Sequence, residues 1–402
     1  MRRPRVKPEH RAYRTSEGNV RIGSVVHGIG AEVADPGGWI WTLVEAMDGS
    51  RTPRGVRDEV AAAHPCVSAE DVVQAMEDLL AAGFVEDAGA APPRDLTRRE
   101  RERYGRGATL ARWMDLTPRT GPWDVQGTLR EARVLLVGVG GTGGYAAEAL
   151  VSSGVGHLHC VDPDVVELSN LNRQPLYREK DIGAPKVDAA LATLRALNSD
   201  VVVTGEQREV ADADGLAALL DAPSGSGRVR GGESGDGRDR GDRGYDLLVV
   251  AADRPPEIRR WANRTCLASG TPWVDAGYRG PLVTVGVHAP GRGACWECLR
   301  AGEVERRDLR LPCGSDEELA SPRMPWNPAS AVTAGLSGLL LAHASLTLLT
   351  GVPPVRPGFR FGLNLMTPGE PVLHRFAARP DCPACGTPTG GRRGGRARGG
   401  AP

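Results

Sequence analysis

One short segment, residues 133–150, restricts the fold of this chain more than any other. It reads RVLLVGVGGTGGYAAEAL, and five of the seven residues at 138–144 are glycine. The apolar run before the glycines is typical of a buried strand, and the alanine-rich run after them is typical of a helix ending at Gly154. A strand, a glycine turn and a helix begin a doubly wound parallel sheet, whose turn binds nucleotide phosphates. The segment therefore predicts an α/β nucleotide-binding domain.

The glycines follow the pattern Gly-x-Gly-x-x-Gly, in which backbone amides and the start of the helix meet phosphate oxygens. The glycines expected to contact the nucleotide are Gly138, Gly140, Gly141, Gly143 and Gly144. Asp162 follows them by roughly 20 residues, the spacing of a carboxylate that binds ribose hydroxyls. Because an NAD-dependent dehydrogenase has the same features, this segment alone leaves that alternative open.

A polar segment after the next predicted strand, HLHCVD, favours a triphosphate. It reads DPDVVELSNLNRQPL, contains Asn170 and Arg173, and precedes a helix expected to start near Pro185, with Lys186 in its first turn. Arg and Lys neutralise the charge that develops as pyrophosphate departs, a task that a dehydrogenase does not have. A further apolar strand, YDLLVVAAD, ends in Asp253 at the carboxyl edge of the sheet, where a carboxylate is suited to hold magnesium.

The residues from about Arg103 to Gly386 resemble the ThiF/MoeB/HesA adenylyltransferases, bacterial relatives of ubiquitin-activating enzymes. The motifs RYGR, VGVGGTGG, SSGVG, DPDVVELSNLNRQ, GAPK and two paired-cysteine motifs occur in the order of that family. The resemblance implies a Rossmann-like, doubly wound, mostly parallel sheet with C-terminal antiparallel strands. It implies ATP and Mg²⁺ as cofactors, and attack of a carboxylate on the α-phosphorus of ATP to give an acyl-adenylate and pyrophosphate.

By position, the resemblance assigns Asp162 to the ribose hydroxyls, Arg173 and Lys186 to the phosphates, and Asp253 to magnesium. Beside the glycines, the expected nucleotide site comprises Asp162, Asp164, Asn170, Arg173, Lys186 and Asp253. Arg106, the second arginine of RYGR, matches the family arginine that reaches into the ATP site of a neighbouring subunit, which implies a homodimer.

The segment around Asp253 departs from the family pattern Asp-x-x-Asp-Asn. Here VAADR has Val250 at the first acidic position and Arg254 in place of asparagine. The magnesium aspartate is kept while its neighbours change, so metal affinity or nucleotide geometry is expected to differ from the family.

Two C-x-x-C pairs predict a metal site. Cys295 and Cys298 lie in CWEC, and Cys382 and Cys385 lie in CPAC. Four thiolates without histidine suit a closed structural zinc site, and the resemblance supports pairing across this long separation, because family members tie the C-terminal strand to the domain in this way. A redox dithiol is the alternative, but it would use one pair and leave the other unexplained.

Cys313, in RLPCGSD, is a candidate catalytic residue. It lies near the position of the family's mobile-loop cysteine, which in some members attacks the adenylate or takes part in sulfur transfer. Cys66, Cys160 and Cys266 lie in apparent helix or strand contexts, where small buried side chains are expected.

The first ninety residues predict a small α+β domain like a winged helix. NVRIGSVV, AEVAD and FVED are expected strands, and helices are expected at WIWTLVEAMDG, after Thr52 and after Ser68, which act as caps. Residues 11–88 resemble the PqqD-like peptide-recognition element of enzymes that modify ribosomally made peptides. This implies that a leader peptide pairs with an exposed strand edge. A DNA-binding winged helix is the alternative, but the segment is not strongly basic.

Composition limits the partners and the compartment. Lys plus Arg equals Asp plus Glu, at 50 each, so no overall charge favours nucleic acid or a membrane surface. Eight cysteines in 402 residues and a start without an apolar signal core indicate a cytoplasmic protein. ASAVTAGLSGLLLAHASLTLLTG is about long enough to span a membrane, but it carries His343 and several hydroxyls, so we expect a buried core helix.

The expected organisation is a peptide-binding domain at 1–90, a linker with the arginine-bearing helix at 91–125, and an ATP-binding domain at 126–386. An insertion at 223–244 and a tail at 387–402 hold too few apolar residues to fold and are expected to be disordered.

Three functions remain open on the sequence. The first is adenylation of a carboxylate of a ribosomally made precursor peptide, with its leader bound by the N-terminal domain. The second is activation of a sulfur-carrier or ubiquitin-like protein that ends in Gly-Gly. The third is a non-catalytic scaffold that presents a precursor to a cyclodehydratase; retention of Arg173, Lys186 and Asp253 argues against it, while the VAADR departure keeps it open.

Overall fold

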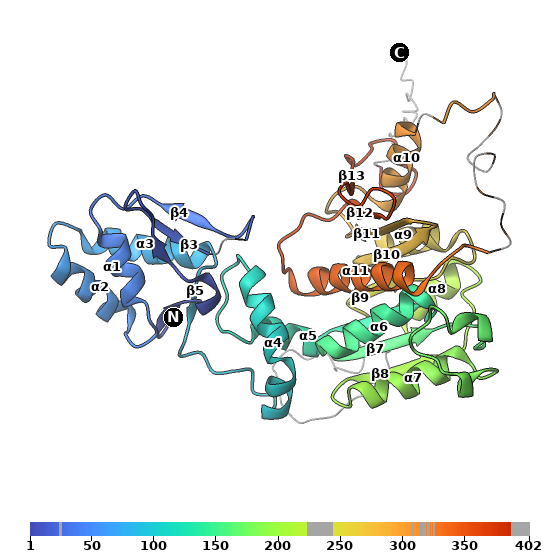
Figure 1. Ribbon diagram of the computed structural model, residues 1–402, viewed down its shortest axis with the longest axis horizontal. Helices are drawn as coiled ribbons and strands as arrows, with labels where there is room; N and C mark the ends of the chain where they lie inside the picture. Colours follow the sequence, from blue (N-terminus) through green and yellow to red (C-terminus); the bar gives the residue numbers. More distant parts are fainter. Residues whose placement is uncertain are drawn as a thin grey trace, which may run out of the picture.

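A mixed sheet of eight strands forms the larger part of the computed structural model, which describes residues 1–23, 26–222, 244–307, 309–313, 315, 319, 322, 324 and 326–386. The strand order is β13-β12-β11-β10-β9-β6-β7-β8. The bounds are β6 Arg133–Val137, β7 His157–Val161, β8 Val202–Glu206, β9 Leu247–Val250, β10 Trp273–Arg279, β11 Leu282–His288, β12 Phe359–Asn364 and β13 Pro371–Arg375. Strands β10 to β8 in this order are parallel, and β11 to β13 continue the sheet antiparallel. This confirms the predicted Rossmann-like architecture with C-terminal antiparallel strands (Figure 1).

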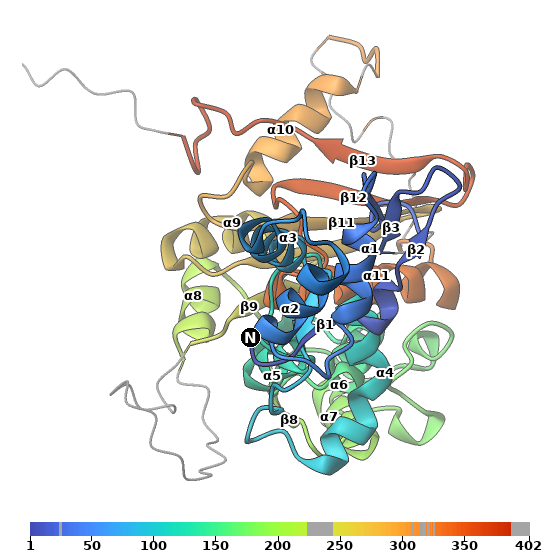
Figure 2. The ribbon, with the colours of Figure 1, turned by 90° about the vertical axis from the view of Figure 1, so that its left-hand side faces the viewer.

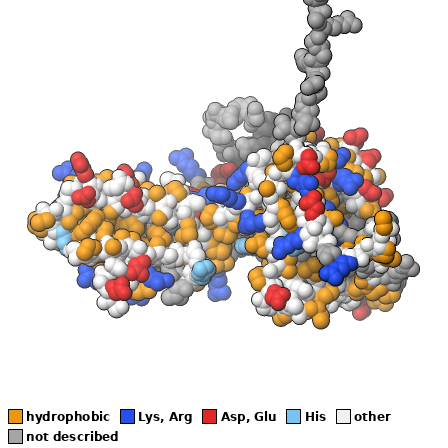
Figure 3. Space-filling model, turned by 90° about the horizontal axis from the view of Figure 1, so that it is seen from above, with side chains coloured by type: hydrophobic (Ala, Val, Ile, Leu, Met, Phe, Trp, Pro, Cys, Tyr) orange, Lys and Arg blue, Asp and Glu red, His pale blue; other side chains and the backbone are white. Residues whose placement is uncertain are grey.

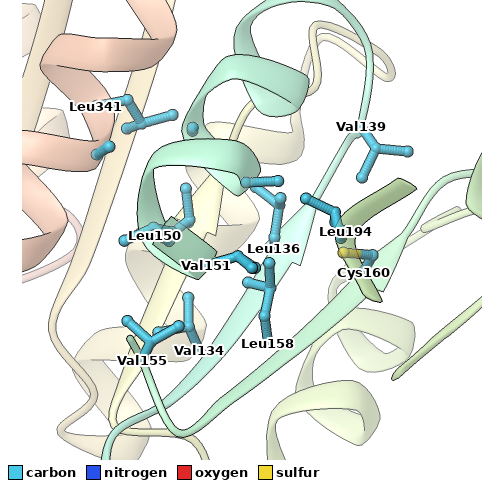
Figure 4. Packing of buried hydrophobic residues seen from close by; sticks show 14 of the residues in the cluster. Val134, Leu136, Val139, Leu150, Val151, Val155, Leu158, Cys160, Leu194 and Leu341 are labelled. Atoms are coloured by element: carbon cyan, nitrogen blue, oxygen red, sulfur yellow. The ribbon is translucent and has the colours of Figure 1, made fainter. Parts of the chain in front are cut away.

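Helices cover both faces of the sheet, as a doubly wound fold requires. They are α6 Gly141–Ser153, α7 Lys186–Leu197, α8 Ala213–Asp221, α9 Ile258–Ser269 and α11 Ala331–Thr350. Val134 and Leu136 of β6 pack with α6, α7 and α11, whereas Leu135 and Val137 pack with α8 and α9. Alternate residues of β6 thus enter different cores, which explains why the four residues after Arg133 are all apolar. Figure 4 shows the first of these cores around Leu136, Leu150 and Leu158.

The long apolar helix α11 lies in the core of the sheet domain. By length and composition it could cross a membrane, since an 18-residue stretch of it has a mean hydropathy of 1.6. However, 56% of that stretch is buried inside the protein. It packs on α6, β10 and β11, so closely that a side chain carbon at Gly338 would lie 2.4 Å from the carbonyl oxygen of Thr142. The prediction that this segment is a buried core helix is therefore confirmed.

The N-terminal residues form a second lobe (Figures 1 and 3), and this lobe has its own apolar core. Its elements are β1 Pro4–Val6, η1 Pro8–His10, β2 Tyr13–Arg14, β3 Val20–Ile22, β4 Ala31–Val33, α1 Trp39–Ala46, α2 Pro53–Ala63, α3 Ala69–Ala81 and β5 Val85–Asp87. Thr52 and Ser68 cap α2 and α3 through their hydroxyl oxygens, as predicted. The expected closing strand exists as β5, but it pairs with β1 and not with the three-stranded sheet β2-β3-β4.

Helix α4 (Arg98–Met114) joins the two lobes and is followed by α5 (Asp124–Glu131). Figure 2 shows the N-terminal lobe in front of the large sheet, with α4 running below it. The hydroxyl of Tyr104 on α4 accepts a 2.8 Å hydrogen bond from Asn198, which follows α7. Near the other end, Arg112 pairs with Glu9 at 3.0 Å and with Glu86 at 3.1 Å. Helix α4 is therefore fixed to both lobes.

The remaining short elements are η2 Leu168–Asn170, η3 Glu179–Asp181 and α10 Trp296–Arg306. The two segments expected to be disordered, 223–244 and 387–402, lie outside the described residues except for Gly244.

Candidate functional site

The glycine turn joins β6 to α6 at the carboxyl edge of the parallel strands. Gly138 has a φ of 93°, a conformation that favours glycine. A side-chain carbon at Gly143 would lie 1.9 Å from the carbonyl oxygen of Gly138, so no other residue fits there. Gly140 is the N-cap of α6, and no described side chain caps its amides. The turn therefore leaves the first amides of α6 without a side-chain cap, the arrangement that suits an anion.

Asp162 follows β7 and lies directly against this turn. Its Oδ2 atom accepts a hydrogen bond from the Val139 amide at 2.8 Å, and its Oδ1 atom accepts one from the Asp164 amide at 3.0 Å. Burial raises the pKa of Asp162, while the nearby Lys186 ammonium and these hydrogen bonds act in the opposite direction. A buried carboxylate at the end of the second strand has the position of a ribose ligand.

Lys186 is the first residue of α7 and is held by Asp164. Its Nζ atom lies 2.8 Å from Oδ2 of Asp164, with the lysine side chain 8% exposed and the aspartate side chain 62% exposed. The ammonium group is thus near Asp162 and is paired with a carboxylate that faces solvent. Asp164 therefore positions the lysine.

The loop after β7 places Asn170 and Arg173 differently. Asn170 is buried, and its Oδ1 atom accepts a hydrogen bond from the Glu167 amide at 3.0 Å, which shapes the loop. Arg173 is partly exposed, and its Nη1 atom donates to the carbonyl oxygen of Ser169 at 2.7 Å. Its guanidinium group also lies close enough to the hydroxyl of Tyr278 to lower the pKa of that group. Arg173 therefore reaches from this loop to the end of β10.

Asp253 lies three residues beyond β9 and approaches the same hydroxyl. Burial raises the pKa of Tyr278; Arg173 lowers it and the charge of Asp253 raises it. The structure therefore brings Arg173 and Asp253 together around Tyr278. Sequence reasoning missed Tyr278, whose only signal was a polar residue at the carboxyl end of an apolar strand.

A second residue that sequence reasoning missed is Arg259, in the first turn of α9. Its Nη2 atom lies 3.1 Å from Oδ1 of Asp253, and its Nε atom lies 3.1 Å from Oδ2 of Asp275 on β10. Burial alone would raise the pKa of Asp275, but Arg360, His288 and Arg259 hold it well below its ordinary value. Asp275 is thus a buried, charged anchor.

The altered pattern at Val250 has a structural counterpart. Val250 on β9 is in parallel register with Asp275 on β10, and the two neighbours lie on the same face of the sheet. A carboxylate is therefore present one strand away from the position where the family pattern has an acid.

Arg106 lies on the exposed face of α4, away from these residues, and forms no ion pair with any described residue. Tyr104, two positions earlier, is buried and anchors the helix. Within one chain, the structure does not bring Arg106 to the site.

The four cysteines of the two C-x-x-C pairs come together as predicted. Their sulfur atoms all lie within 4.8 Å of one another, with Cys295 at 3.6 Å from Cys382 and Cys298 at 3.5 Å from Cys385. Tetrahedral zinc thiolates at about 2.3 Å place sulfur atoms about 3.8 Å apart, so the cluster fits one zinc ion. The cluster joins the start of α10 to the segment after β13.

Cys313 is exposed, and no contact with the nucleotide-site residues is present in the described part of the chain. Its neighbours 314 and 316–318 lie outside the described residues. A catalytic role for Cys313 stays a prediction.

The fold and the site together define a doubly wound nucleotide-binding protein whose C-terminal strands end at a four-cysteine cluster. The chain belongs to the ThiF family, which matches residues 112–385.

Several curated proteins are similar to this part of the chain. Ubiquitin-like modifier-activating enzyme 5 of Oryza sativa subsp. japonica is 30% identical over 64% of this chain and 57% of its own length. Bovine adenylyltransferase and sulfurtransferase MOCS3 is 31% identical over 73% of this chain and 55% of its own length. The SAMP-activating enzyme E1 of Haloferax volcanii is 30% identical over 65% of this chain and 83% of its own length. The chain thus spans little more than half of the first two proteins.

Solved structures extend the similarity in fold to nearly the whole chain. Escherichia coli MccB has a TM-score of 0.68 and 20% identity, covering 96% of this chain and 97% of that one. PaaA has a TM-score of 0.61 and 23% identity, covering 93% and 100%. Because the MccB match covers 96% of the chain, it includes the N-terminal lobe as well as the sheet domain.

Proposed function

We propose that this chain is an ATP-dependent adenylyltransferase that activates a carboxylate of a ribosomally made precursor peptide. A carboxylate oxygen of the peptide attacks the α-phosphorus, and the bond from that phosphorus to the oxygen bridging to the β-phosphate breaks. Pyrophosphate leaves with this bond's electron pair, and the peptide remains as an acyl-adenylate. The observation that carries the proposal is the convergence of the glycine turn, Asp162, Lys186 and Asp253 at the carboxyl edge of β6, β7 and β9.

Each group at this edge suits one part of ATP. Asp162 would bind the ribose hydroxyls, while the turn amides, Arg173 and Lys186 would bind the phosphates. Asp253 is an oxygen ligand suited to Mg²⁺, which would neutralise phosphate charge when bound. The residues of the chain act mainly by positioning the phosphates and by balancing their charge as pyrophosphate forms.

The N-terminal lobe is proposed to bind the leader of the peptide. Strand β4 is an edge of the three-stranded sheet, and an extended peptide can add to such an edge through main-chain hydrogen bonds. The similarity to MccB supports this arrangement, because MccB has been solved both with ATP and with MccA.

The remaining features of the proposal concern assembly and metal. Arg106, exposed on α4, would complete the site of a second copy in a homodimer. The four-cysteine cluster would hold structural Zn²⁺. The neutral charge balance and thiol content suit a cytoplasmic enzyme that does not bind nucleic acid.

A second candidate is activation of a small carrier protein that ends in Gly-Gly. The names of the curated relatives favour it, since they include ubiquitin-like modifier-activating and SAMP-activating enzymes. The family match begins only at residue 112, so the N-terminal lobe is an addition to the adenylyltransferase domain. Such an addition favours the peptide substrate, because the lobe is proposed to bind its leader. The non-catalytic scaffold is disfavoured by the Lys186–Asp164 pair and by Asp253, which remain in place at the phosphate-binding edge.

ATP–pyrophosphate exchange tests the proposal. We expect exchange that depends on a precursor peptide encoded near the gene and that is lost when its leader is removed. Exchange with a Gly-Gly tail lacking any leader would favour the carrier protein. Absence of both exchange and ATP binding would leave the scaffold.

A further inference from the structure

Arg259 connects an exposed aspartate to a buried one. Its Nη2 atom donates to Oδ1 of Asp253 at 3.1 Å and to the carbonyl oxygen of Ala276 at 3.1 Å. Its Nε atom donates to Oδ2 of Asp275, also at 3.1 Å. The side chain of Asp253 is 62% exposed, whereas that of Asp275 is 1% exposed. Arg259 therefore has a fixed, buried attachment and an outer end that faces the proposed nucleotide site.

Asp275, the buried partner of Arg259, is itself fixed by side chains from other strands. Asp275 accepts a hydrogen bond from Nε2 of His288 on β11 at 2.9 Å and one from Nη1 of Arg360 on β12 at 3.3 Å. Arg360 is paired in turn with Glu303 of α10 at 3.0 Å. Since four elements meet at this cluster, the carboxylate that orients Arg259 cannot move independently of the sheet.

The outer end leaves one oxygen of Asp253 available. Among the described residues, Arg259 is the ion-pair partner of Asp253 and contacts its Oδ1 atom. The Oδ2 atom of Asp253 has no hydrogen bond to any described residue. Gly277 of β10 makes room for the pair, because a side-chain carbon there would lie 3.3 Å from Nη2 of Arg259 and 3.8 Å from Oδ1 of Asp253. A carboxylate that is fixed through one oxygen and free at the other is preorganised for a cation.

We propose that Arg259, anchored by Asp275, is a positioning residue that fixes Asp253 through Oδ1 and leaves Oδ2 to bind the divalent cation of a bound nucleotide. This inference rests on the proposed function. Without Arg259, an exposed aspartate on a loop samples several rotamers and must be ordered when the cation binds. Lysine cannot replace this arginine, because one ammonium group cannot reproduce the two-sided fork.

The test measures cation binding and not turnover. Mn²⁺ affinity is measured by electron paramagnetic resonance on the full chain, with a non-hydrolysable ATP analogue present. In Arg259→Lys the positive charge is kept and the fork is lost, so we expect Mn²⁺ affinity to fall by about tenfold or more, as when other partners of metal ligands are changed. Binding of the analogue without Mn²⁺ should not change. The control is Arg260→Lys, the exposed neighbour on the same helix, which should match the wild type.

A second variant guards against misfolding. Gly277→Ala crowds the pair without altering any charge, so it should also weaken Mn²⁺ binding while zinc content and thermal stability are compared with the wild type. Unchanged or increased Mn²⁺ affinity in both folded variants, with normal binding by the wild type, would overturn the inference alone. Failure of the wild type to bind Mn²⁺ with the analogue would overturn the proposed function, and the inference with it.

Discussion

Lys186 and Asp164 are joined twice, because the Nζ atom lies 2.8 Å from Oδ2 of the aspartate and the lysine amide donates to the aspartate carbonyl oxygen at 2.9 Å. The side-chain pair lies beside Asp162, whose pKa is raised by burial, an effect that the Lys186 charge partly offsets. A phosphate that enters the site would therefore meet a lysine that is already oriented by a carboxylate on the solvent side.

Lys186→Gln should reduce ATP–pyrophosphate exchange by about a hundredfold or more, because a cation aimed at developing phosphate charge is lost. Asp164→Asn should have a smaller effect, since Lys186 remains and loses only the carboxylate that orients its ammonium group. Lys180→Gln changes an exposed lysine on η3 and serves as the control. Exchange rates at saturating ATP are the measurement, and equal loss in Lys180→Gln would contradict the assignment.

Gly143→Ala should destabilise the fold as well as the site. The added carbon would lie 1.9 Å from the carbonyl oxygen of Gly138, so the turn must open. We expect a loss of about 3 kcal/mol or more, in the range of severe packing changes. Gly105→Ala is the matched control, because nothing lies within 4 Å of its added carbon and alanine favours a helix by about 1 kcal/mol over glycine. Thermal unfolding should move in opposite directions for the two variants.

The strand, turn and helix around Gly143 could be predicted from the sequence because the signals are local: an apolar run, a required glycine and a helix end at Gly154. Each C-x-x-C pair is likewise a local motif, but the joining of the two pairs across a long separation was predictable only through the family resemblance. The contacts of Arg259 were not predictable, because they depend on the register of β9 with β10 and on side chains from β11 and β12. Pairing of β1 with β5 was missed likewise, since 80 or so residues separate the two strands.

Arg106→Ala should abolish exchange if the exposed arginine serves a second copy. Mixing Arg106→Ala with Lys186→Gln should restore part of the activity, because a mixed dimer would contain one site with both native residues. The measurement is exchange after mixing under conditions that allow subunits to redistribute. No recovery, in spite of mixed dimers detected by mass spectrometry, would mean that Arg106 acts within its own chain or not at all.

Cys382→Ser should remove most of the bound metal, since three thiolates remain where four sulfur atoms now lie within 4.8 Å. Zinc per chain should fall from about one to near zero, and hydrogen exchange should increase in β13 and α10, which the cluster ties together. Cys66→Ser is the control, because Cys66 lies outside the cluster and, contrary to the buried position expected from the sequence, is exposed in a turn. Full zinc content in Cys382→Ser would show that the cluster is not the zinc site.

His157 should make stability depend on pH in a defined direction. Its side chain is buried on β7, with Nε2 2.7 Å from the Thr204 hydroxyl oxygen, and burial, followed by the charges of Arg133 and His159, lowers its pKa from 6.5 to about 4. Between these values the unfolded chain binds a proton that the native chain does not. The stabilisation is therefore complete above pH 6.5 and falls as the pH drops toward 4, by about 3 kcal/mol in total.

The comparison of His157→Gln with the wild type isolates this effect from zinc loss and from other groups that titrate in acid. The variant should be less stable at pH 7.5, because it loses a packed imidazole, but its denaturation midpoint should fall less steeply between pH 6.5 and 5. His27→Gln, an exposed histidine in the N-terminal lobe, should keep the wild-type slope. If the slopes of His157→Gln and the wild type are the same, His157 is not the group whose buried neutral form stabilises the sheet.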